Sequence, residues 1–224
     1  MHLKKSMKFL IQLSLVSFLL TGSLLVPGYF LWYKVKLVPA KTGINNTAKN
    51  KNYNATIALR LKSKTAQIKN FAKINNYNIT YCFMVDMHMA SGEKRYFIYN
   101  LIKDSIELSG LVTQGCGRDG VDAGIKFSNT ANSLCTSLGR YQVGNAYTGK
   151  FGLAFKLYGL DKTNSNAASR VVVLHAMGCI PNYETAPLRI CESWGCPAVS
   201  PIFLQKIRHY LEKTQKPMLM DIYY

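Results

Sequence analysis

The stretch NITYCFMVDMHM, residues 78–89, decides the fold class of this 224-residue chain. Its apolar residues recur at every second position, the period of a β-strand that turns one face to a core. His88 lies on the opposite side of that row, so we expect it to be solvated and not to bind a ligand. A turn at Ser91-Gly92 leads into the run KRYFIYNLI, residues 94–102, and a third apolar run follows at residues 106–113. These runs predict an antiparallel meander. The alternating row consists of Ile79, Tyr81, Phe83, Val85, Met87 and Met89.

Further strands and a few helices are predicted beyond the meander. Residues 61–74 keep a loose helical spacing, and Ser200-Pro201 provides an N-cap and a first-turn proline for a helix that ends near Lys213. Residues 115–139 are rich in glycine, serine and asparagine and predict loops. The result is a mainly β (α+β) domain with two or three peripheral helices at residues 57–224. Strand-like runs stand at residues 140–143, 152–158, 170–175 and 218–224.

The N-terminal part of the chain is expected to lie outside this domain. Residues 9–33 carry no charge and end in an aromatic cluster beside Lys34, and ~1.5 Å per helical residue lets them cross a hydrocarbon core of ~30 Å. We therefore expect residues 1–33 to be a transmembrane signal anchor, with the domain on the outer (periplasmic or extracytoplasmic) side. A cleaved signal peptide is the alternative, and would leave the domain secreted or periplasmic. Residues 34–56 are rich in Asn and Lys and predict a flexible tether.

The formal charge of +17 does not indicate a nucleic-acid partner. Eight of the positive charges are lysines within residues 1–51, which hold no acidic residue. The rest of the excess is spread along the chain without a dense Lys/Arg block or a nucleic-acid-binding motif. Such a basic surface suits proximity to anionic membranes, so we expect a membrane and no nucleic acid among the partners.

The segment HAMGCIPNYETAPLRICESWGCPAV, residues 175–199, holds one of the four histidines and three of the six cysteines. A metal site would use His175, Cys179, Cys191 and Cys196, but their spacing contains no close pair such as C-x2-C. We therefore expect neither a metal nor a cofactor. Disulfides are the second interpretation, because an exported domain meets an oxidising compartment. The candidate pairs are Cys179–Cys191 and Cys116–Cys135, with Cys82 as a buried free thiol.

A thiol nucleophile with its base is the third interpretation. The apolar run at residues 171–174 is typical of a buried strand and delivers His175 at its end. Cys196 follows Gly195, where backbone amides can approach a substrate oxygen and hold an oxyanion. A free cysteine is only a few per cent thiolate at neutral pH, so a neighbouring imidazole is needed to take its proton. A cysteine and a histidine in one chain are by themselves a weak signal, and on spacing alone a buried structural cysteine is favoured over a nucleophile.

The spacing from His175 to Cys196 resembles the signature of the L,D-transpeptidase catalytic domain, the YkuD-like fold. In that signature a histidine is followed by about 14 to 17 residues and then by Ser/Thr-x-Gly-Cys; here 17 residues separate His175 from Ser193-Trp194-Gly195-Cys196. The continuation Pro197-Ala198 is similar to the branch that carries S-x-G-C-P-A. The resemblance covers roughly residues 80–224.

The resemblance implies a β-sandwich or barrel and a cysteine enzyme that acts on peptidoglycan stem peptides. Cys196 would attack the carbonyl of an L-centre, release the terminal D-residue and form a thioester, with His175 as base and then acid. An amine acceptor makes the enzyme an L,D-transpeptidase, and water makes it an L,D-carboxypeptidase. Ser193 and Gly195 are implied to shape the loop around the nucleophile. The residues expected to contact substrate are Trp194, Arg170 and Tyr141.

Three positions depart from the family pattern. Trp194 stands where many members have histidine, which leaves His175 as the only nearby base. Glu192 stands where arginine is common and Ala176 where glycine is common. Because Glu192 puts a negative charge where a cation would hold a substrate carboxylate, a non-catalytic envelope-binding module of the same fold is an alternative function. A zinc-binding module ranks third.

Overall fold

The structure is a computed structural model that describes residues 45–120 and 124–224. The chain divides into two units, Met1–Asn54 and Ala55–Tyr224, and the second contains the whole sheet. The predicted transmembrane segment, residues 1–33, lies outside the described residues. Among the residues that are described, no helix has both the length and the apolar character to cross a membrane.

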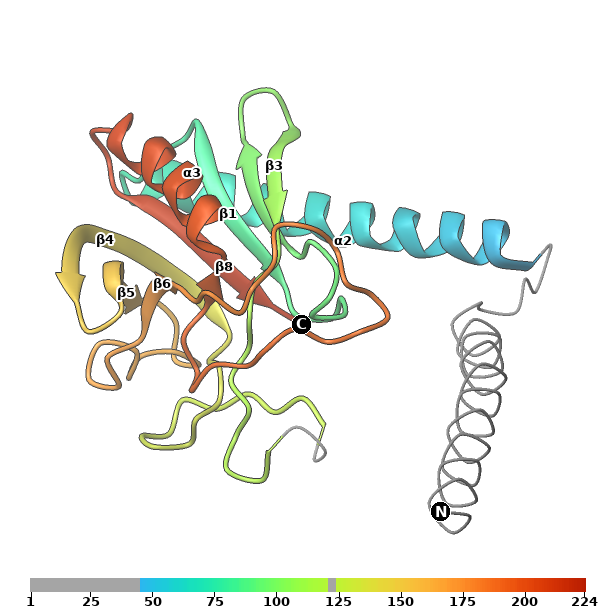
Figure 1. Ribbon diagram of the computed structural model, residues 1–224. Coiled ribbons are helices and arrows are strands. Elements are labelled where there is room, and N and C mark those ends of the chain that lie inside the picture. The colour runs from blue at the N-terminus through green and yellow to red at the C-terminus, as the bar shows by residue number, and fades with distance from the viewer. Residues whose placement is uncertain (1–44, 121–123) are drawn as a thin grey trace, which may run out of the picture. The chain divides into compact units, whose positions relative to one another are not determined.

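The second unit is built on one eight-stranded mixed sheet (Figure 1) with the strand order β3-β2-β1-β8-β4-β5-β6-β7. The predicted meander is confirmed, since β1 pairs antiparallel with β2 and β2 with β3. The late strand β8 lies at the centre, parallel to β1 and antiparallel to β4. The strands are β1 (Tyr81–Asp86), β2 (Tyr96–Asn100), β3 (Ser105–Gly110), β4 (Gly139–Gly149), β5 (Gly152–Gly159), β6 (Val173–Ala176), β7 (Ala198–Val199) and β8 (Met218–Tyr223).

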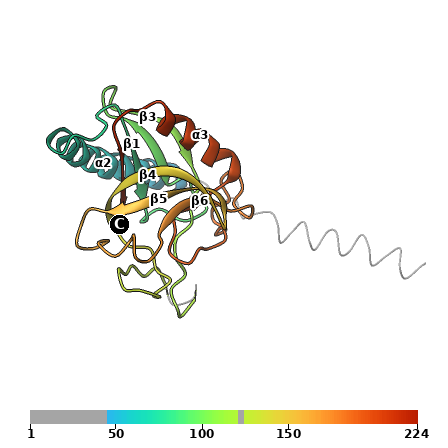
Figure 2. The same ribbon diagram turned by 90° about the vertical axis from the view of Figure 1, so that its left-hand side faces the viewer.

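Both faces of the central strands are buried, and not only the face predicted from the alternating row. Phe83 and Val85 point into a core that includes residues of α3, while Cys82 and Met84 point into a second core that includes residues of α2. The two helices therefore cover opposite faces of the sheet, and Figure 2 shows them on either side of β1. This explains why β1 reads as a nearly continuous apolar run.

The helix α3 (Pro201–Glu212) agrees with its predicted position. The Oγ atom of Ser200 accepts a hydrogen bond from the backbone N–H of Phe203 at 3.1 Å, as an N-cap side chain does. The proline occupies the first turn, where its missing N–H costs nothing. Leu204 and Ile207 of α3 are buried against the sheet, so this helix depends on its apolar face as much as on its cap.

The helix α2 (Asn45–Ile74) begins earlier than predicted. Residues 45–56 were expected to belong to a flexible tether and are helical instead. The stretch contains neither glycine nor proline, so nothing in it breaks a helix that tertiary packing stabilises further along. That packing comes from Leu61, Ile68 and Ala72, which are all buried in the core between α2 and the sheet.

The mainly β architecture with two described helices confirms the predicted class, but the sheet is not a closed barrel. Within residues 45–120 and 124–224 the strand order ends at β3 on one side and at β7 on the other. The strand predicted from residue 170 begins only at Val173, because a turn runs up to Val171, whose φ of 56° lies outside the strand region. The two-residue strand β7 was not predicted at all.

Candidate active site

The parallel strands β6 and β7 at one edge of the sheet place His175 and Cys196 on neighbouring chain segments. In the parallel pair β6–β7, His175 lies opposite Ala198. Cys196 comes two residues before Ala198 and therefore lies beside Val173. Its Sγ atom is 3.5 Å from the backbone N of Val173 and 3.9 Å from the backbone O of Val171. Cys196 and His175 are thus on adjacent chain segments, and Cys196 lies level with Val173, two residues before His175.

The Cys196 thiol is held in its neutral form. Burial raises the pKa of this thiol, while the Val173 N–H and the positive charge of Arg170 act in the opposite direction. The net pKa lies above the ordinary value of 9.0. At neutral pH the sulfur therefore needs a base at the moment of reaction, since only the thiolate is a strong nucleophile.

His175 is suited to be that base. Its side chain is 3% exposed, and burial lowers its pKa below 6.5 despite the opposing hydrogen bond to the Ala176 carbonyl. The Nδ1 atom lies 3.0 Å from this carbonyl oxygen, which can only accept, so Nδ1 carries the proton. The imidazole is then neutral at pH 7 and its Nε2 lone pair is free to take a proton.

An aromatic side chain covers the imidazole. Phe151 stacks on His175 with ring centroids 4.3 Å apart and an interplanar angle of 23°. Phe151 belongs to the turn between β4 and β5 and is half exposed. The sequence did not point to Phe151, because 23 residues separate it from His175 and no local pattern links the two. An exposed aromatic residue next to a glycine at a hairpin turn was the one available signal.

Ser193 fixes the loop that carries the nucleophile. Its Oγ atom lies 2.6 Å from the Cys196 carbonyl oxygen and 3.1 Å from that of Gln114, and it accepts from the Gly195 N–H at 3.3 Å. Its backbone N–H donates to the Gln114 carbonyl at 2.9 Å. Ser193 is only 5% exposed. Ser193 therefore stabilises the loop from within, by hydrogen bonds to its backbone.

Gly195 is required by both its conformation and its surroundings. Its φ of 107° lies in the region that side chains disfavour, and a Cβ atom would lie 2.7 Å from the Cys135 carbonyl oxygen. The Gly195 N–H is used by Ser193, whereas the Cys196 N–H donates to no acceptor within the described parts of the chain. The Cys196 amide is therefore the loop donor left for a substrate oxygen.

Two of the three predicted substrate contacts are turned inward. Tyr141 is fully buried, and its hydroxyl donates to the Ser137 carbonyl at 2.6 Å. The Arg170 guanidinium donates to the backbone oxygens of Cys135 at 2.6 Å and Ser128 at 2.8 Å. Both residues hold the loops beneath Cys196, and Tyr141 has no surface to offer a substrate. Trp194, by contrast, is 76% exposed next to the cysteine loop.

Glu192, near Cys196 in the chain, lies within the electrostatic range of a buried cation. Its carboxylate interacts with Arg95, a fully buried residue whose guanidinium donates to the carbonyls of Val112 and Met89. One carboxylate oxygen, Oε2, is buried without a hydrogen-bond partner. The buried positive charge of Arg95 thus partly balances the negative charge of Glu192. Arg95 directly precedes β2, and no local sequence pattern indicates its interaction with Glu192.

The cysteines follow only part of the predicted pairing. Cys179 and Cys191 form a disulfide, and Cys82 is a buried free thiol, as predicted. The pair Cys116–Cys135 was wrong: both are free, and the Cys135 thiol donates to the Ser133 carbonyl instead. The disulfide uses two of the four ligands of the zinc interpretation. Among the described residues, no group of three His, Cys, Asp or Glu is placed to hold a metal ion.

Comparison with known protein families identifies the family of this chain. The model of the L,D-transpeptidase catalytic domain matches residues 53–219, so the chain belongs to that family. A search of curated proteins gives no match.

Solved structures that resemble the chain do so at low identity. The helical cell shape determining protein Pgp2 from Campylobacter jejuni is 16% identical, with a TM-score of 0.41 over 69% of this chain and 54% of that one. The L,D-transpeptidase from Xylanimonas cellulosilytica is 13% identical, with a TM-score of 0.38 over 69% and 68%. An Enterococcus faecium L,D-transpeptidase is 13% identical, with a TM-score of 0.39 over 64% and 50%. The chain thus spans about half the length of two of these three proteins.

Proposed function

We propose that this protein is a cell-envelope L,D-transpeptidase that acts on peptidoglycan stem peptides through a thioester on Cys196. The observation that carries the proposal is the placement of Cys196 beside the strand of His175, whose neutral imidazole has a free Nε2 atom. Family membership supports the substrate class.

The raised pKa of the Cys196 thiol and the lowered pKa of His175 favour a mechanism in which the proton moves during the attack. A raised thiol pKa and a lowered imidazole pKa both disfavour a resting thiolate–imidazolium pair. The proton therefore moves from Sγ to Nε2 as the sulfur attacks the carbonyl carbon of the L-centre. The Cys196 N–H donates to the oxyanion that forms. A single donor of this kind typically contributes about 3 kcal/mol to transition-state stabilisation.

The intermediate then collapses to products. The C–N bond to the terminal D-residue breaks, its amine takes the proton from Nε2, and the acyl group stays on Sγ as a thioester. An acceptor amine next attacks the thioester, transfers a proton to His175 and returns the thiol. If water is the acceptor, the same steps give an L,D-carboxypeptidase, which is the alternative activity at this site. Trp194, exposed beside the loop, is our candidate for substrate contact.

Mass spectrometry of the intact chain tests the acylation step. After incubation with a tetrapeptide stem, we expect a mass increase equal to the tripeptide acyl group, located on Cys196, and release of the terminal D-residue. Cys196→Ala should abolish both. Cys82→Ala is the matched control, because this buried thiol lies in the other core, under α2, and should acylate Cys196 normally. Folded protein that shows neither acylation nor release would sink the proposal.

A non-catalytic envelope-binding module is the second candidate, favoured by the raised pKa of the Cys196 thiol and by Glu192. In that case the chain binds stem peptides without turnover. Cells that carry Cys196→Ala would then behave like the wild type and the purified variant would bind stems equally well. If Cys196→Ala cells behave like cells that lack the protein, while the purified variant still binds stem peptides, this candidate is excluded.

We also propose that residues 1–33 anchor the domain to the outer side of the cytoplasmic membrane. The uncharged stretch of residues 9–33 supports this proposal, and so does a substrate class that lies outside the cytoplasm. Extraction of membranes with alkaline carbonate should leave the full chain in the pellet. Protease added to spheroplasts should digest the domain. A soluble, shorter chain would instead indicate cleavage of a signal peptide.

A further inference from the structure

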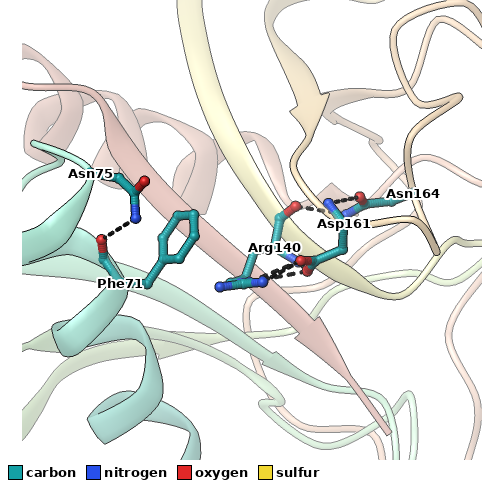
Figure 3. A network of polar contacts seen from close by, with 5 residues as sticks. All are labelled: Phe71, Asn75, Arg140, Asp161 and Asn164. Carbon is teal, nitrogen blue, oxygen red and sulfur yellow. Dashed lines mark hydrogen bonds and ion pairs between the residues drawn. The ribbon is translucent and has the colours of Figure 1, made fainter.

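The space between α2 and the sheet contains a cavity that shares no residue with the Cys196 site. It has a volume of about 600 Å³ and is bordered by α2, the start of β4, the loop after β5 and the end of β8. Ligand pockets typically have volumes of roughly 300–1,000 Å³. Part of its wall is drawn in Figure 3. The residues on which the argument depends are Lys64, Ile68, Phe71, Arg140, Asp161 and Asp221.

Asp221 is a buried carboxylate without a hydrogen bond. It is 5% exposed, lies in the middle of β8 and lines the cavity. No donor among the described residues reaches its side chain. Burial raises its pKa to about 6, Lys64 and Arg140 oppose this shift, and Asp161 adds to it. A buried carboxylate that lacks donors is costly to the fold, so its presence calls for a partner from outside.

Arg140 is not that partner, because its own bonds hold it. Its Nε atom donates to Asp161 at 3.1 Å, its backbone N–H donates to the same carboxylate at 2.7 Å, and its guanidinium lies 4.1 Å from the Phe71 ring centroid. Asn164 fixes the arrangement further by donating to the Arg140 carbonyl at 2.7 Å. Figure 3 shows the guanidinium between Phe71 and Asp161.

Lys64 is the cation of the cavity that remains available. Its Nζ atom lies 5.5 Å from the Tyr223 ring centroid and forms no ion pair within the described residues. Among the described residues, the cavity therefore presents one carboxylate without a hydrogen bond and one ammonium group without an ion pair. Ile68 and Phe71 of α2 supply an apolar wall beside them.

We propose that this cavity binds a small zwitterion with an apolar side chain, of the size of an α-amino acid or a dipeptide. The ammonium group of the ligand pairs with Asp221 and its carboxylate with Lys64, while its side chain packs against Ile68 and Phe71. Only a molecule with both charges satisfies both groups. The site is independent of acyl transfer at Cys196.

Binding of L-leucine to the full chain, measured by calorimetry, tests the site. N-acetyl-L-leucine lacks the ammonium group and L-leucinamide lacks the carboxylate, so each should bind at least about ten-fold more weakly, a loss of ~1.4 kcal/mol. Asp221→Asn and Lys64→Met should each weaken L-leucine binding by a similar factor. Lys62→Met, an exposed residue of the same helix, is the matched control and should bind normally.

Three results would overturn the proposal. The first is that no binding is detected at an L-leucine concentration of about 10 mM, at which a millimolar Kd would be seen. The second is that both derivatives bind as tightly as L-leucine, and the third is that both variants bind L-leucine as tightly as the wild type. If Asp221→Asn does not fold, the carboxyl ¹³C shift of Asp221 during an L-leucine titration decides, since direct pairing must move it. Cys196→Ala should keep full L-leucine binding, so failure here is distinguishable from failure of the acyl-transfer proposal.

Discussion

Two carboxylates lie under α2 on the same face of the sheet, and the fold treats them oppositely. Asp86, at the end of β1, is fully buried and accepts two hydrogen bonds from Arg60 at 3.1 and 2.7 Å and a third from the His88 N–H at 3.0 Å. Asp221 is almost as buried and has no such donor. Burial alone therefore does not identify a structural carboxylate. The hydrogen-bond donors around each carboxylate distinguish the two. Asp86 holds α2 through Arg60, whereas Asp221 remains available to a ligand.

Removal of the Arg60 charge should have the largest effect on stability. In Arg60→Met the Asp86 side chain, 0% exposed, stays behind without its counter-ion. Breaking a buried pair in this way costs about 3–5 kcal/mol, and the partial exposure of Arg60 places our expectation near the lower end. Urea unfolding at pH 7 measures it. A loss below ~1 kcal/mol would show that Asp86 does not need Arg60, and Lys62→Met on the same helix controls for the loss of a surface charge.

Asp221→Asn should have the opposite sign. The folded pKa of Asp221, about 6, lies above its ordinary value of 3.8, so the folded state binds the proton more tightly and loses stability as the pH rises through 6. The variant should gain up to about 3 kcal/mol at pH 8, and the difference should vanish below pH 4. Urea unfolding at the two pH values tests this. A destabilised variant at pH 8 would mean that Asp221 has an internal partner.

His175, the base that we propose, is a third buried group, and a smaller effect is expected there. Phe151→Ala uncovers the His175 ring, so its lowered pKa should rise toward 6.5. Because the reaction needs the neutral imidazole, kcat/KM rises with pH through this pKa, and the acid limb should move upward in the variant.

We expect a loss of up to about four-fold at pH 6, or ~0.8 kcal/mol, and a smaller loss at pH 8. A pH profile of acylation rates for Phe151→Ala measures both. Lys150→Ala, an exposed neighbour in the same turn, should leave the profile in place. Equal losses at both pH values would show that Phe151 acts on something other than the protonation of His175.

Sequence reasoning succeeded where a signal is local. The alternating row at residues 78–89, the Ser200-Pro201 cap and the apolar run at 218–224 each identified an element, and the His–Cys spacing identified the family. The prediction of a flexible tether was wrong at residues 45–56, because it rested on composition. Composition does not show that a helix stabilised by packing further along the chain continues into this stretch. The stacking of Phe151 on His175 and the electrostatic effect of Glu192 on Arg95 arise between distant parts of the chain, which no local pattern encodes.

The central position of β8 has a consequence for the order in which the sheet can be completed. The hydrogen-bonding edges of β1 and β4 that face β8 stay unpaired until residues 218–223 have been synthesised. Up to that moment the domain consists of two partial sheets with exposed apolar edges, which are prone to pair with other chains. A chain interrupted before Met218 should therefore be a target for aggregation or proteolysis, even though every residue of its candidate active site has already been made.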